Sequence, residues 1–84
     1  MPLLWQPGPM WMIYMNKTIQ VIINGIQETV TENTTISQLI VRHKEGDADL
    51  IVEHNGRFVY PRKYEELILS HEDRIEFINP NFGG

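Results

Sequence analysis

Apolar and polar residues alternate along the early part of the chain. Ile19, Val21 and Ile23 occupy every second position, and an Asn24-Gly25 pair follows directly. A period of two is typical of a half-buried strand, and Asn-Gly is the strongest short signal for a two-residue hairpin turn. The pattern therefore predicts a strand that turns back into a second strand over Ile26 to Thr31.

A helical pattern follows the second strand. Thr35 and Gln38 have the spacing of a capping box, in which each side chain accepts a hydrogen bond from the other residue's backbone N–H. The next apolar residues recur at helical spacing and form one face: Ile36, Leu39 and Ile40. We predict a helix that begins after Thr35, ends near Lys44 and packs its apolar face on a sheet.

Beyond the helix, the sequence predicts two short strands joined by a second turn. Leu50 to Glu53 and Phe58 to Tyr60 are rich in strand-forming residues, and Asn55-Gly56 lies between them. Pro61 ends the second of these strands, because proline has no N–H to donate to a sheet ladder.

The last part of the chain combines a helical segment with a final strand. Tyr64 to Leu69 are predicted to form one or two helical turns. The alternation in Arg74 to Ile78 predicts a strand with Ile75 and Phe77 on one face. The whole order indicates an α+β domain, in which one main helix packs across a mixed sheet.

Residues 1–14 differ in composition from the rest of the chain. They contain both tryptophans, three of the four methionines and three of the five prolines, and no charged side chain. Those prolines obstruct a regular helix or a central strand. We expect residues 1–14 to be an extension outside the fold, the domain to span 15–84 with a natural start at Met15, and residues 80–84 to form a flexible tail.

Size and charge narrow the range of functions. The 84 residues, 42% hydrophobic and 21% charged, fit one globular domain that is too small for an elaborate active-site cleft. The net charge of −4 argues against a nucleic-acid partner, which requires a basic stripe. No stretch approaches the ~20 apolar residues of a membrane span and no secretory signal is present, so we expect a cytoplasmic protein.

Neither the cysteine content nor the histidines point to a reactive centre. The chain has no cysteine, so it has no thiolate ligand or thiol nucleophile. The sequence places no carboxylate to orient His43, His54 or His71, and none of their spacings suits a metal, so they are interpreted as surface residues. Five acidic residues could contact a basic partner, but we favour the interpretation that they form a solvated face: Glu65, Glu66, Glu72, Asp73 and Glu76.

Four aromatic residues are candidates for contact with a partner. Phe58, Tyr60 and Tyr64 form either an exposed docking patch or part of the small core, and the sequence supports both interpretations equally. Phe82 lies beyond the last predicted strand and beyond Pro80, so recognition by a partner is the better interpretation for it.

Six short motifs together carry a family resemblance. They are Val21-Ile22-Ile23-Asn24-Gly25, Thr35-Ile36-Ser37-Gln38-Leu39, Asn55-Gly56-Arg57-Phe58-Val59, Pro61-Arg62-Lys63-Tyr64, Glu72-Asp73-Arg74-Ile75-Glu76 and Gly83-Gly84. Over residues 17–84 the chain resembles the ThiS sulfur carriers, within the β-grasp set that includes MoaD and ubiquitin. The chain departs from the family pattern in two places. One residue is inserted near Tyr60. Glu72 replaces the usual glycine, and we expect the turn there to bend differently because non-glycine residues avoid positive φ.

The resemblance implies a β-grasp fold and a function located in the C-terminal tail. In such carriers the terminal carboxylate, here that of Gly84, is adenylated and then converted to a thiocarboxylate that donates sulfur. Gly83 lets the tail thread a narrow channel because glycine lacks a Cβ. The carrier is then not an enzyme and binds no cofactor of its own, because the ATP is used by the activating partner.

The resemblance also implies partners. These are a ThiF-like adenylating enzyme, a sulfur donor and a ThiG-like thiazole synthase that accepts the sulfur. We expect neither a nucleic acid nor a membrane as a partner. Two alternatives stay open from the sequence. One is a MoaD-like subunit of molybdopterin synthase, or a carrier for another sulfur pathway, and the other is a ubiquitin-like protein modifier or interaction module.

Overall fold

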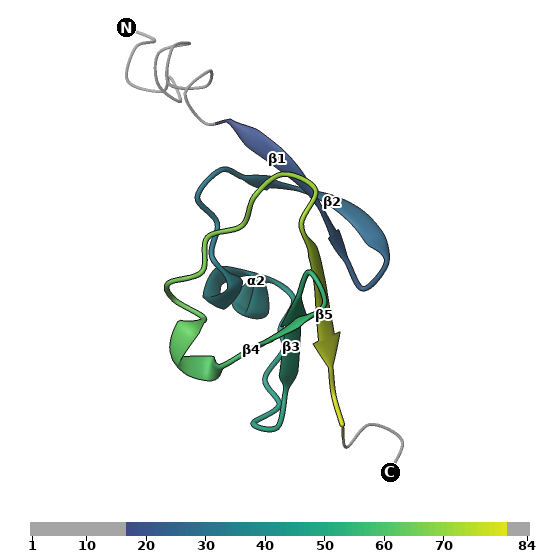
Figure 1. Ribbon diagram of the computed structural model, residues 1–84, viewed down its shortest axis with the longest axis vertical. Helices are drawn as coiled ribbons and strands as arrows, with labels where there is room; N and C mark the ends of the chain where they lie inside the picture. Colours follow the sequence, from purple (N-terminus) through teal and green to yellow (C-terminus); the bar gives the residue numbers. More distant parts are fainter. Residues whose placement is uncertain (1–16, 81–84) are drawn as a thin grey trace, which may run out of the picture.

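The computed structural model describes residues 17–80, which form a five-stranded sheet with one α-helix packed on one face (Figure 1). The elements in order are β1 (Thr18–Ile23), β2 (Ile26–Thr31), α2 (Ile36–Arg42), β3 (Ile51–His54), β4 (Arg57–Val59), the 3-10 helix η2 (Pro61–Lys63) and β5 (Arg74–Ile78). This order confirms the predicted α+β architecture. Residues 1–14 and most of the predicted tail lie outside the described residues, so their placement stays a prediction.

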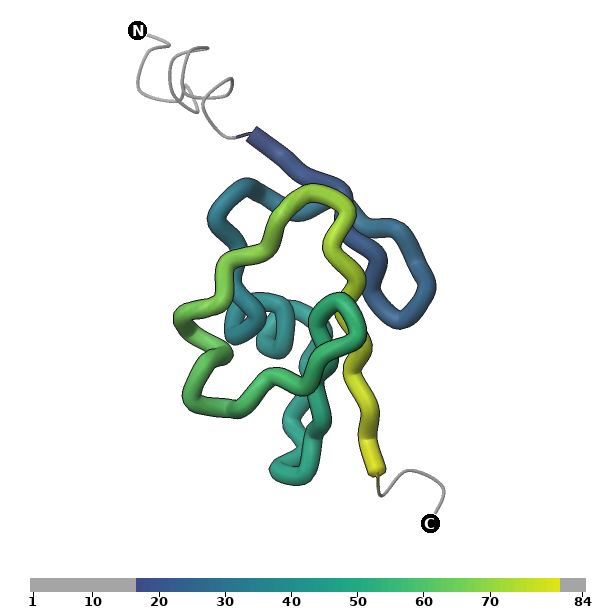
Figure 2. The backbone as a smooth tube through the Cα atoms, in the orientation of Figure 1, coloured from purple at the N-terminus to yellow at the C-terminus, as the bar shows by residue number. Residues whose placement is uncertain are grey.

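The first and last strands are neighbours at the centre of the sheet. The strand order is β2-β1-β5-β3-β4, with β1 and β5 parallel and every other pair antiparallel. Figure 2 traces this path, in which β5 enters last and lies between β1 and β3. The parallel contact is short, because it joins only Ile22 to Arg74 and Ile23 to Ile75.

Both predicted hairpin turns are confirmed. Asn24 and Gly25 have φ values of 50° and 84°, and Asn55 and Gly56 have φ values of 52° and 82°. Two consecutive residues with positive φ match the two-residue turns that suit the twist of antiparallel strands. The turns therefore set the register of β1 with β2 and of β3 with β4.

The capping box and the apolar face of α2 are also confirmed. The Gln38 backbone N–H donates to Thr35 Oγ1 at 3.2 Å, and the Thr35 backbone N–H donates to Gln38 Oε1 at 2.9 Å. The helix buries Ile36 and Leu39 completely. Around them lies the rest of the core, which consists of Val21, Ile23, Val30, Val52, Val59, Leu69, Ile75 and Phe77.

The helix predicted over Tyr64 to Leu69 is wrong. The helical turn occurs earlier, at Pro61–Lys63, where proline suits the first position because it lacks the N–H that would be unbonded there. Hydrogen-bonded turns continue over 64–66, where the Glu66 and Leu67 N–H groups both donate to the Lys63 carbonyl at 3.0 Å. The chain then extends, so that the Leu69 N–H donates to the Thr34 carbonyl at 2.8 Å while Ile68 forms a bridge with Thr35. Tertiary hydrogen bonds to the start of α2 thus replace helical ones in the second half of the predicted helix.

The expectation that Glu72 would change the turn before β5 is also wrong. Glu72 adopts φ of 71°, in the region that glycine favours. The Asp73 N–H donates to the Ser70 carbonyl at 3.1 Å and closes the turn. The Glu72 N–H bonds to the Gln20 carbonyl of β1, so the surrounding contacts hold a conformation that glutamate disfavours.

Candidate functional site

One face of the sheet packs against α2, and the other, open face has an apolar end. In the register of β3 with β5, Ile51 lies opposite Ile78. Val52 lies opposite Val59 in β4, so the next position places Tyr60 opposite Ile51. We call Tyr60, Ile51 and Ile78 the apolar row. It crosses the sheet where β5 ends, directly before the residues that lead to the tail.

An exposed aromatic pair extends the apolar row. Phe58 and Tyr60 are 51% and 54% exposed, and their rings meet edge to face with centroids 4.8 Å apart. The Arg62 guanidinium lies 4.8 Å from the centroid of the Tyr60 ring, in cation–π range. Beside β4, a groove of about 390 Å³ is lined in part by these two aromatic residues. Phe58 and Tyr60 are therefore exposed and not part of the core, and their role in docking stays a prediction.

Tyr64 is separate from this pair. It is half-buried and packs against the hydrophobic core, and its carbonyl accepts a hydrogen bond from the Ser37 N–H at 2.8 Å. Burial raises the pKa of its phenol above the ordinary value. The core interpretation describes Tyr64 better than the docking interpretation.

Three contacts fix the point from which the tail leaves the domain. The Phe77 backbone N–H donates to Asn24 Oδ1 at 2.8 Å. The Phe77 ring lies against the His43 ring, with centroids 5.9 Å apart. The Asn79 side-chain amide donates at 3.2 Å to Oε1 of Glu45, which lies in the loop that follows α2. Phe82, Gly83 and Gly84 themselves lie outside the described residues.

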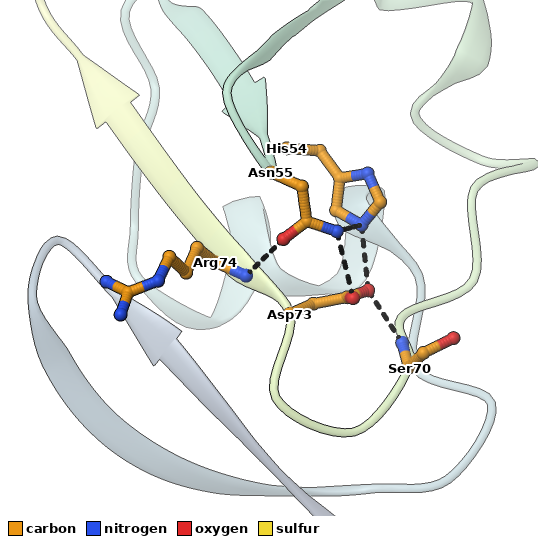
Figure 3. Close-up of polar contacts among 5 residues, drawn as sticks. All are labelled: His54, Asn55, Ser70, Asp73 and Arg74. Carbon is orange, nitrogen blue, oxygen red and sulfur yellow. Dashed lines mark hydrogen bonds and ion pairs between the residues drawn. The ribbon is translucent and has the colours of Figure 1, made fainter.

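A polar network lies at the opposite end of β5 and centres on Asp73 (Figure 3). The Asp73 carboxylate accepts hydrogen bonds from His54 Nε2 at 2.7 Å, from the Ser70 N–H at 2.8 Å and from Asn55 Nδ2 at 3.1 Å. The Asn55 Oδ1 in turn accepts from the Arg74 N–H at 2.8 Å. We call Asp73 and these partners the Asp73 network.

The Asp73 network corrects two interpretations made from the sequence. Asp73 is only 8% exposed, so it does not belong to a solvated acidic face. His54 is half-buried and oriented by a carboxylate, which the sequence did not place beside it. A sequence separation of 19 positions hides the contact, and only the pairing of β3 with β5 brings the two residues together.

The pKa of Asp73 reports two opposing effects. Burial alone raises the pKa of a carboxyl group, but the hydrogen bonds from His54, Ser70 and Asn55, with the charge of His54, outweigh it. The pKa of Asp73 is therefore held below its usual value. The network ties the β3–β4 hairpin to the start of β5, so its role is structural.

The other two histidines also have specific neighbours. His43 Nε2 lies 3.3 Å from Glu28 Oε1, and His71 Nδ1 accepts a hydrogen bond from the Gln20 N–H at 3.1 Å. Within residues 17–80, no group of three or more His, Cys, Asp or Glu side chains is arranged to hold a metal ion. No helix among the same residues is long and apolar enough to cross a bilayer.

Sequence reasoning missed four residues that shape the tail end of the sheet. Ile51 and Ile78 alternate with the buried Val52 and Phe77, and this alternation was the signal that could have placed them on the open face. Asn24 was recognised only as a turn residue, although its side chain also bonds β5. Glu45 carried no local signal, because its partner is 34 residues away.

Comparison with known proteins places these features in a family. The ThiS family model matches residues 12–84. Among solved structures, the thiamine biosynthesis protein ThiS of Geobacter metallireducens superposes with a TM-score of 0.68 at 25% identity, covering 79% of this chain and 100% of that one. No curated protein matches in a sequence search. The matched region includes the strands, the helix and the Gly83-Gly84 end, so the chain belongs to the ThiS family.

Proposed function

We propose that this protein is a sulfur carrier of thiamine biosynthesis and that its reacting group is the carboxylate of Gly84. The observation that carries the proposal is membership of the ThiS family over residues 12–84. The structural neighbour from Geobacter metallireducens, a thiamine biosynthesis protein, supports the same pathway. In this proposal the protein is the substrate of partner enzymes in the cytoplasm and catalyses no reaction itself.

The proposed chemistry has two steps. The Gly84 carboxylate is ionised at neutral pH, and one of its oxygens attacks the α-phosphorus of ATP on a ThiF-like enzyme. Pyrophosphate leaves and an acyl-adenylate forms. Hydrosulfide supplied by a sulfur donor then attacks the carbonyl carbon, the C–O bond to AMP breaks and AMP leaves, and loss of the S–H proton gives the thiocarboxylate at Gly84. The carrier needs neither a cysteine nor a bound cofactor for these steps.

The fixed base of the tail supports this role. The contacts of Phe77 and Asn79 hold the end of β5, while the four residues from 81 to 84 span at most about 14 Å. The active site of the ThiF-like enzyme must therefore approach the domain closely. Phe58 and Tyr60, which are exposed near that end, are proposed to contact it, and Phe82 is proposed to be gripped within the enzyme.

Intact-mass measurement tests the central proposal. Incubation with ATP, a ThiF-like enzyme and a sulfur donor should replace one oxygen by one sulfur, and fragmentation should localise the change to Gly84. A chain that lacks Gly83-Gly84 should keep its thermal stability and gain no sulfur. Sulfur on a side chain, or unchanged sulfur incorporation in the truncated chain, contradicts the proposal.

A substitution at Phe82 tests the role proposed for that residue. Phe82→Ala should slow thiocarboxylate formation while changing the free energy of unfolding by no more than about 0.5 kcal/mol, as for an exposed position. A large fall in melting temperature would instead place Phe82 in the core.

The sulfur acceptor is tested separately. The thiocarboxylated protein should transfer sulfur to a ThiG-like thiazole synthase in preference to the catalytic subunit of molybdopterin synthase. Preference for the latter would retain the carrier chemistry and change the pathway. Formation of an amide between Gly84 and a protein lysine would support a ubiquitin-like modifier.

A further inference from the structure

Two glutamates lie side by side on the open face, next to the apolar row. In the register of β3 with β5, Glu53 lies directly opposite Glu76. We call these two residues the acidic pair. Phe58 lies opposite Glu53 on the other side, so the acidic pair and Phe58 form a second row beside the apolar row.

The acidic pair is unfavourable in the isolated domain. Directly opposed side chains on neighbouring strands have Cβ atoms roughly 5 Å apart, and like charges in this arrangement destabilise a sheet. Within residues 17–80 neither carboxylate makes a hydrogen bond or an ion pair. Arg74 lies two residues before Glu76, on the same face of β5, yet forms no ion pair with it. Within the described residues the pair therefore has no ion-pair partner.

The position of the acidic pair places it near any enzyme that acts on Gly84. Glu76 precedes Ile78 by two residues, or about 7 Å along the strand. The tail beyond Pro80 reaches no further than about 14 Å. An enzyme that holds Gly84 in its active site thus lies close to the apolar row and, one row further along, to the acidic pair.

We propose that the open face at the tail end binds the activating enzyme, and that this enzyme inserts a cationic side chain between the two glutamates. The apolar row and Phe58 border the charged contact on two sides and reduce its access to water, which strengthens the attraction. This inference rests on the proposed function, because it names the partner that acts on Gly84. The acidic pair then determines which enzyme binds, while the apolar surface supplies contact area.

The charge of this surface disfavours a second copy of the chain as the occupant. In a symmetric dimer, the same patch on both subunits meets itself. Two acidic pairs would then face each other across an apolar contact, where like charges repel strongly. A partner with a basic side chain relieves the repulsion within the pair, and a second copy increases it.

The test compares a double variant, Glu53→Gln with Glu76→Gln, with the control Glu32→Gln with Glu65→Gln, which changes the net charge equally at two exposed positions away from the pair. The measured quantities are the KM of the cognate ThiF-like enzyme for the carrier and the melting temperature of the free carrier. The test variant should raise KM by about tenfold, reduce its dependence on salt and leave the melting temperature equal or higher. The control should change neither quantity.

Each other outcome has a definite meaning. An unchanged KM for the test variant, or an equal change in the control, overturns the inference while the wild-type carrier is still thiocarboxylated. A wild-type carrier that is not thiocarboxylated at Gly84 overturns the proposed function and the inference with it. A concentration-dependent dimer that hides Phe58 and Tyr60 from solvent also overturns the inference, because the occupant is then a second copy.

Discussion

The two ends of β5 are held in different ways. At its start, the buried carboxylate of Asp73 is bonded to three neighbours within the domain (Figure 3). At its end, Tyr60 and Ile78 of the apolar row are exposed, Ile51 is half-buried, and Glu76 lies opposite Glu53 without an ion pair within the described residues. The polar groups at the start of the strand thus find their hydrogen-bond partners within the domain. The side chains at its end remain available for contact with a partner protein. Substitutions at the start should therefore affect stability, and those at the end should affect binding.

The largest effect on stability is expected for Asp73→Asn. The neutral amide accepts hydrogen bonds more weakly than a carboxylate and leaves a buried donor of the Asp73 network poorly bonded, at a cost of about 2 kcal/mol in the free energy of unfolding. Denaturant titration at neutral pH measures this difference. Glu65→Gln, at an exposed position, is the control and should change stability by less than about 0.5 kcal/mol.

The same variant should change the response to acid. The pKa of Asp73 is lower in the folded protein than its ordinary value of about 3.9, so the unfolded chain binds the proton more readily. The stability that Asp73 provides is complete above that ordinary value and is lost as the pH falls through the lower, folded value. The stability gap between wild type and Asp73→Asn should therefore narrow as the pH falls below that ordinary value and through the lower, folded value. A constant gap would contradict the lowered pKa.

A smaller loss of stability is expected for Asn24→Gly, because the Asn24 side chain bonds β5 at Phe77. Glycine accepts the positive φ of 50° but removes the oxygen that bonds the Phe77 N–H, so the free energy of unfolding should fall by about 1 kcal/mol. Asn33→Gly is the matched control, since Asn33 also has positive φ, at 72°, and no side-chain hydrogen bond in the described part of the chain. Equal effects of the two variants would mean that the hydrogen bond from Phe77 to Asn24 does not contribute to the free energy of unfolding.

Glu72→Gly should stabilise the polar end of β5. Glutamate at φ of 71° carries a conformational strain of about 1 kcal/mol that glycine does not, and part of the gain is offset by the greater freedom of glycine in the unfolded chain. We expect the melting temperature to rise by a few degrees. A fall would show that the Glu72 side chain makes a contribution larger than the strain.

The smallest effect on stability is expected for Ile78→Thr, at the open end. Ile78 is 39% exposed, and threonine keeps the branched shape that suits a strand, so the free energy of unfolding should change by about 0.5 kcal/mol. The KM of the activating enzyme should nevertheless rise, because the apolar row loses contact surface. A stability loss as large as that of Asp73→Asn would remove the contrast between the two ends.

Local patterns in the sequence predicted most of the secondary structure. The two Asn-Gly turns and the capping box at Thr35 depend on residues close in sequence, and the structure confirms all three. The final strand was also predicted with its bounds and its buried face, because Ile75 and Phe77 alternate with exposed residues. Such features follow from residues close in sequence and need no distant contact.

Features that depend on distant contacts were not predicted. In place of the helix expected over Tyr64 to Leu69 the structure has turns followed by an extended segment bonded to the start of α2, and Asp73 was expected on the surface but is buried. In the candidate site, too, residues with a local signal were predicted and residues that depend on strand register were not. The aromatic pair was named from the sequence as one of two equal interpretations, whereas Ile51 and Ile78 became candidates only once the register placed them opposite each other.

The central position of β5 has a consequence for synthesis of the protein. The strand that completes the sheet is the last to be made, and its neighbours β1 and β3 have no other link to each other in the sheet. While the ribosome still encloses β5, the nascent chain contains two separate hairpins and a helix with an unfilled gap between them. Sheet closure must therefore wait until β5 has left the ribosome, and contacts so distant in sequence slow it further. Until then the nascent domain cannot present a finished docking face.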